Sequence, residues 1–265
     1  MRSSNPALNR LAPAQTATNA YGESGWYAPG ATGAPTAGPV VEAARSASMT
    51  VDDVTVRTIG LLVLLAAAGG IAWGVVPAQW QGAVLLVGVF GGLILGLVIS
   101  FGRTTNPLLI AAYTVLQGAA VGLISKQYND WYNGIVVQAV AATFAVFFVM
   151  LILYRFKVLR ATPRFTKGLI GALIAAVVLM FGDLILSLFG VHTGLRQNGL
   201  VGILFSIAMI ALGALTFILD FDAVEQGVRA QLPKRYAWYA AFGIVVGLIW
   251  VYLEILRLLG YARDR

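Results

Sequence analysis

The stretch Gly199–Leu219 decides the fold class of this chain. It reads GLVGILFSIAMIALGALTFIL and holds no ionisable side chain. A helix of ~20 apolar residues is long enough to cross the hydrocarbon core of a bilayer. The residues do not alternate between polar and apolar, as they would in the strands of a membrane β-barrel. The stretch is therefore predicted to be a transmembrane helix.

Six further apolar runs resemble this one in length and composition. They are separated by short segments, several of which carry a proline near the end of a run. We therefore predict an all-α integral membrane protein with seven transmembrane helices. The seven runs are Ile59–Val76, Gly82–Phe101, Leu108–Ser125, Ile135–Tyr154, Gly168–Phe189, Gly199–Leu219 and a run within Tyr236–Leu259.

The composition of the 265 residues excludes several classes of protein. Hydrophobic residues make up 59% and charged residues 11%, which suits neither a single soluble domain nor a disordered chain. No cysteine is present, which excludes disulfides, thiolate metal sites and cysteine catalysis. The one histidine, His192, lies in a polar loop. The sequence has no intramembrane Ser–His pair and no phosphate-binding loop, so neither an enzyme nor a cofactor is expected.

The first 57 residues differ from the rest of the chain. They are rich in Ala, Gly, Pro, Ser and Thr. We predict a flexible cytoplasmic tail over residues 1–57 and a transmembrane domain over residues 58–265. Within the tail, Thr50 followed by Asp52 and Asp53 has the pattern of a helix start, with Thr50 as the N-cap.

The basic residues predict the orientation in the membrane. Lys and Arg near the ends of the runs concentrate on the side that holds the N-terminus, above all in the segment Arg155–Lys167. The opposite side has only Lys126, Arg196, Arg263 and Arg265. The positive-inside rule then places the N-terminus in the cytoplasm and the C-terminus outside the cell membrane. It also accounts for the net charge of +7 without a nucleic-acid partner.

Ionisable residues inside the runs are the candidate functional residues, because each is costly at membrane depth. The acids Asp220 and Asp222 end the sixth run, and Glu254 lies within the seventh. The sixth and seventh runs are consecutive and antiparallel, so an acid of the sixth can lie beside Glu254. Two carboxylates in a low dielectric share a proton or bind a cation such as Ca²⁺. Asp220 and Asp222 are about 200° apart around a helix, so only one of them can face that partner.

Each candidate also has a structural interpretation. Glu254 and Arg257 have the i, i+3 spacing of an internal ion pair. Asp222 could belong to a solvated helix end. Asp183, in the fifth run, could bond Ser187 or the neighbouring backbone. Arg103, after the second run, could be a simple membrane anchor.

The ends of the last two runs resemble the Bax inhibitor-1 family, including its YccA-like bacterial members. The segments that carry the resemblance are Phe217–Asp222, which reads FILDFD, and Tyr252–Gly260, which reads YLEILRLLG. The resemblance implies a central helix surrounded by six others and a pH-dependent calcium leak controlled by two carboxylates. It assigns the seventh-helix acid to Glu254, where other members have Asp.

The resemblance also implies the remaining site residues. The sixth-helix acid falls on Asp222 or Asp220, and an arginine latch falls on Arg103. Asp222 and Glu254 would then contact Ca²⁺. Asp183 and Arg257 are secondary candidates for a different reason, because they are the other ionisable residues inside the runs. We therefore expect a calcium leak channel or exchanger whose ligands are Ca²⁺ and protons. The alternatives are a proton-coupled transporter of a small substrate and a non-conducting regulator that binds a membrane protease or another membrane protein.

Overall fold

The structure is a computed structural model that describes residues 48–190, 193–195, 197 and 199–264. Within these residues, seven long α-helices follow one another, and each is long and apolar enough to cross a membrane. The prediction of an all-α protein with seven transmembrane helices is confirmed. The helices are α2 (Val51–Val75), α3 (Ala78–Gly102), α4 (Pro107–Trp131), α5 (Ile135–Arg155), α6 (Pro163–Leu188), α7 (Leu200–Arg229) and α8 (Tyr236–Arg263).

Helix α2 begins with the cap that the sequence predicts. The Thr50 hydroxyl accepts a hydrogen bond from the Asp53 amide at 3.1 Å, and the Asp53 carboxylate accepts one from the Thr50 amide at 3.3 Å. This reciprocal pair satisfies two of the amides that a helix start leaves open. The prediction of a tail through residue 57 is therefore corrected for residues 51–57, which form the first two turns of α2. Residues 1–47 lie outside the described part.

Glycines allow α2 and α4 to pack at close range. A Cβ atom on Gly118 would lie 2.6 Å from the carbonyl oxygen of Leu65, and one on Gly122 would overlap the backbone of Gly69. Gly118 and Gly122 are four residues apart, so they form one face of α4. This is the close backbone approach expected of small residues four apart in membrane helices.

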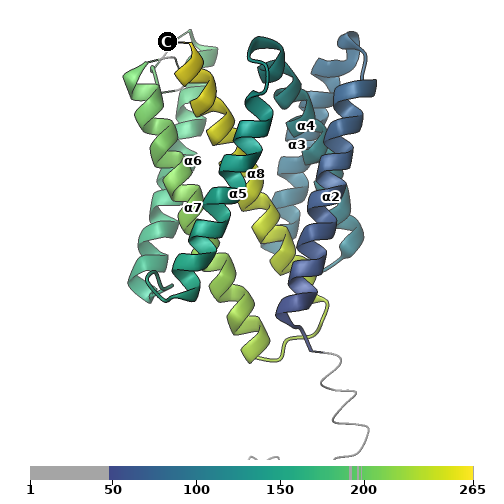
Figure 1. Cartoon of the computed structure of the whole chain (residues 1–265), viewed down its shortest axis with the longest axis vertical. Coiled ribbons are helices and arrows are strands. Elements are labelled where there is room, and N and C mark those ends of the chain that lie inside the picture. The colour runs from purple at the N-terminus through teal and green to yellow at the C-terminus, as the bar shows by residue number, and fades with distance from the viewer. Residues whose placement is uncertain (1–47, 191–192, 196, 198, 265) are drawn as a thin grey trace, which may run out of the picture. The chain divides into compact units, whose positions relative to one another are not determined.

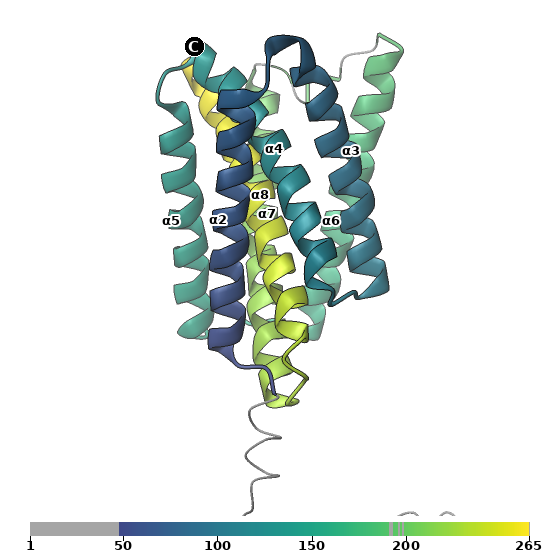
Figure 2. The same ribbon diagram turned by 90° about the vertical axis from the view of Figure 1, so that its right-hand side faces the viewer.

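Helix α8 is the central helix of the bundle. It packs against α2, α4, α5 and α7, while α3 packs on α4 and α6 packs on α7. Figure 1 shows α8 crossing the bundle obliquely, and Figure 2 shows α3 and α6 at its edge. Five of its side chains have no exposed surface at all: Ala237, Ala241, Val245, Val251 and Leu256.

Glycine contacts also define the register of α7 against α8. Gly213 of α7 lies against Trp250 and Val251, and Gly247 of α8 lies against Phe217. Residues that lie farther along α7 therefore meet residues that lie earlier on α8, which makes the two helices antiparallel. The register sets the height of every acidic residue on these helices.

The start of α2 is tied to the loop between α7 and α8. The Met49 amide donates a hydrogen bond to the carbonyl oxygen of Leu232 at 2.7 Å. Asp53 forms ion pairs with Arg57 at 3.1 Å and with Lys234 at 2.9 Å. These contacts connect the first and last helices at one end of the bundle, which is opposite to the end that holds the C-terminus (Figure 1).

Candidate functional site: acidic residues along the central helix

Glu254 is the buried acid of the central helix. Only 3% of its surface is exposed. Arg257, less than one turn farther along α8, donates a hydrogen bond from Nη1 to Glu254 Oε1 at 2.7 Å. The ion pair that the i, i+3 spacing allows is therefore formed. It offsets the cost of a carboxylate at membrane depth, since a buried charge is tolerated when a counter-charge contacts it.

Asp220 faces α8, but at a different height. Its Oδ1 lies 3.1 Å from the position that a Cβ atom on Gly243 would take. Gly243 and Glu254 are about 16 Å apart along the helix axis at 1.5 Å per residue. The structure therefore does not bring Asp220 beside Glu254, and the predicted carboxylate pair is absent from this conformation.

Asp222 is half-buried and points elsewhere. Its carboxylate accepts a hydrogen bond from the side chain of Gln226, one turn farther along α7. By the register of α7 and α8, Asp222 lies even farther from Glu254 than Asp220 does. The prediction that Asp220 and Asp222 point in different directions agrees with this geometry, and of the two Asp220 is the one that faces the central helix.

The other two candidates lie outside the centre of the bundle. Arg103 is exposed and ends α3 in the left-handed conformation, with φ at 45°. No ion pair of Arg103 occurs within the described residues, so the latch is not formed in this conformation. Asp183 of α6 accepts a hydrogen bond from Thr193, which follows α6. A structural partner for Asp183 is therefore present in Thr193.

The acids do not converge on a metal site. In the described part of the chain, no three Asp, Glu or His side chains come close enough to hold one ion together. The predicted joint site of Asp222 and Glu254 for Ca²⁺ is not assembled in this conformation, because the register of α7 and α8 places the two acids at different heights.

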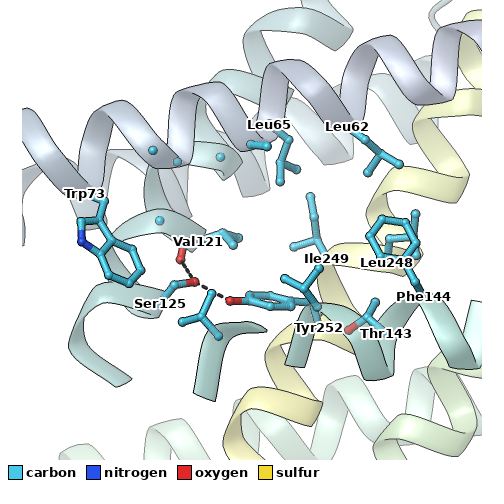
Figure 3. A pocket seen from close by; sticks show the side chains of 17 residues that line it. Leu62, Leu65, Trp73, Val121, Ser125, Thr143, Phe144, Leu248, Ile249 and Tyr252 are labelled. Carbon is cyan, nitrogen blue, oxygen red and sulfur yellow. Dashed lines mark hydrogen bonds between the residues drawn. The ribbon is translucent and has the colours of Figure 1, made fainter. Parts of the chain in front are cut away.

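Two polar contacts between helices were not predicted from the sequence. The hydroxyls of Ser125 on α4 and Tyr252 on α8 lie 2.7 Å apart in a buried hydrogen bond. Figure 3 shows this pair beside a cavity of about 270 Å³. Tyr154 of α5 donates a hydrogen bond to Glu225 of α7, which also binds Arg229. The sequence does contain a signal for these contacts, namely hydroxyl groups within apolar helices. Such groups need a hydrogen-bond partner when they are buried.

The sequence of this chain matches one known protein family. A family described as Bax inhibitor 1 like matches residues 5–264, which is nearly the whole sequence. No curated protein matches the chain.

Proposed function

Since this chain belongs to the Bax inhibitor 1 like family, we propose that it is a pH-dependent leak channel or exchanger for Ca²⁺. We place it in the cell membrane, with the loop between α5 and α6 in the cytoplasm, because that side carries most of the Lys and Arg residues. Its ligands would be Ca²⁺ and protons, with no cofactor and no enzymatic reaction.

The observation that carries the proposal is the buried ion pair of Glu254 with Arg257. Carboxylate oxygens are the ligands that Ca²⁺ prefers. In this conformation Arg257 contacts Oε1 of Glu254, which makes the acid a poor cation site. A proton on Glu254 would remove its attraction for Arg257, and a Ca²⁺ ion would compete with Arg257 for the same oxygen. Both events would release Arg257 from Glu254. A fall in pH and the binding of Ca²⁺ would therefore act on the same ion pair.

Asp220 provides a second acidic position along the same helix. It faces Gly243, where the absence of a side chain on α8 makes room for the Asp220 carboxylate. We propose that Asp220 and Glu254 act as two successive positions for a cation, about 16 Å apart along α8. This replaces the shared-proton pair of the sequence-based hypothesis, whose two members lie at different heights.

Calcium flux into dye-loaded liposomes tests the proposal. Glu254→Gln should flatten the dependence of flux on pH, and Asp220→Asn should lower the flux. Asp222→Asn is the matched control, because its carboxylate bonds Gln226 on its own helix, and it should keep the wild-type curve. A proton gradient that drives the flux would identify exchange, whereas flux without one would identify a leak.

Two results would overturn the proposal. If Glu254→Gln and Asp220→Asn both keep the wild-type curve, the acids are structural. If the folded wild-type protein carries no Ca²⁺ at any pH, a non-conducting role would take its place.

A further inference from the structure

An apolar groove runs between α2 and α5. It consists of two adjoining cavities, of about 270 and 560 Å³, that share Leu62, Phe144 and Leu248 in their walls. Figure 3 shows the smaller cavity, with α2 on one side and the shared residues at one end. Helix α8 contributes to the wall of both cavities, so the groove lies over the central helix.

The larger cavity extends from the shared residues to one end of the bundle. Along α2 its wall runs from Val51 to Leu62, which is about 16 Å at 1.5 Å per residue. One leaflet contributes about half of the ~30 Å hydrocarbon thickness. The cavity is therefore about one leaflet deep. Side chains at its edges are exposed, with Ile59 at 56% and Phe148 at 54%, so the cavity is open toward the bilayer.

The mouth of this cavity carries an excess of positive charge. Its charged wall residues are Arg155, Arg229 and Glu225. Arg229 and the hydroxyl of Tyr154 both bind Glu225, whose charge is thereby matched. Arg155 is exposed and forms no ion pair with any residue that the structure describes. A basic side chain at the end of an apolar groove between membrane helices suits an anionic lipid headgroup.

We propose that the groove binds an anionic phospholipid from the leaflet on the side of Arg155. One acyl chain lies between α2 and α5, and the phosphate contacts Arg155. The depth of the cavity matches the length of the chain, and the free charge at the mouth matches the headgroup. The proposal does not depend on Ca²⁺ transport, since none of the wall residues named here is Asp220 or Glu254.

Native mass spectrometry of the delipidated full-length protein provides the test. The probes are phosphatidylglycerol and phosphatidylcholine with identical acyl chains. We expect the wild-type protein to bind phosphatidylglycerol in preference. A basic residue near a membrane surface contributes enough attraction that Arg155→Gln should reduce this preference about fivefold. Arg160→Gln, which is exposed in the loop that follows α5 and lies outside the cavity wall, should preserve it.

A second variant tests the position of the acyl chain. Thr55 lines the cavity and is exposed, so Thr55→Trp should obstruct part of it and weaken the binding of both lipids. Val63→Trp is the matched control, because Val63 is exposed on α2 but lines none of the cavities described here. Equal binding of the two lipids, or an unchanged preference in Arg155→Gln, would overturn the proposal. So would a lipid-free dimer that Thr55→Trp disrupts, because a second copy would then occupy the groove.

Discussion

Arg257 Nη1 lies 2.7 Å from Glu254 Oε1, so the central helix supplies the counter-charge for its own buried acid. Both partners are largely withdrawn from solvent, with side-chain exposures of 21% for Arg257 and 4% for Glu254. The ion pair needs no other helix to form. It can therefore persist while neighbouring helices shift, and it can open without unfolding α8.

Loss of one partner of this ion pair should destabilise the protein strongly. We expect Arg257→Gln to lower the free energy of unfolding by about 3–5 kcal/mol, because it removes the guanidinium charge that contacts the buried carboxylate of Glu254. The double variant Glu254→Gln/Arg257→Gln should be more stable than Arg257→Gln alone. Unfolding of the four proteins in detergent micelles, compared as a double-mutant cycle, measures the coupling. Strictly additive effects would show that the two side chains do not stabilise each other.

Substitution of Gly122 should disturb the contact between α2 and α4. A methyl group there overlaps the backbone of Gly69, which cannot move aside like a flexible side chain. We expect Gly122→Ala to cost about 1–3 kcal/mol, as overpacking does elsewhere. Gly74→Ala on α2 is the control, because a Cβ atom there meets nothing within 4 Å. Equal melting temperatures for the two variants would contradict this account.

The hydrogen bond between Ser125 and Tyr252 should contribute modestly to stability. Tyr252→Phe removes one hydroxyl, while Ser125 keeps its bond to the carbonyl oxygen of Val121 at 2.6 Å. We therefore expect a loss of about 0.5–1.5 kcal/mol. Thermal unfolding of Tyr252→Phe, Ser125→Ala and the double variant measures it. If Tyr252→Phe destabilises a Ser125→Ala background as much as the wild type, the hydrogen bond contributes nothing.

The orientation in the membrane can be tested with single cysteines, because the chain has none of its own. We expect Arg160→Cys, in the loop between α5 and α6, to resist a membrane-impermeant thiol reagent in intact cells. It should react once the membrane is permeabilised. A cysteine at Asp264, beyond α8, should show the opposite pattern, since three crossings, α6, α7 and α8, separate residue 160 from residue 264. Labelling of residue 160 from outside would reverse the proposed topology.

Several features of the fold could be predicted from the sequence because they are local. The number of crossings follows from the lengths of apolar runs relative to the bilayer. The start of α2 follows from Thr50 and Asp53, which are three residues apart and cap the helix reciprocally. The pairing of Glu254 with Arg257 was one of two interpretations that the sequence left open. It could be foreseen because i, i+3 neighbours lie on one side of any helix.

Contacts between helices depended on the tertiary structure. Any acid near the end of α7 was a candidate partner for Glu254, because the sequence does not specify how far one helix slides along another. The glycine contacts of Gly213, Gly243 and Gly247 determine that register, and they place Asp220 about 16 Å from Glu254 along α8. The groove between α2 and α5 has the same origin. Along the groove, α2 and α5 each pack on α8 and not on each other, which leaves a gap between them. The groove is therefore a property of the packed bundle and not of either helix alone.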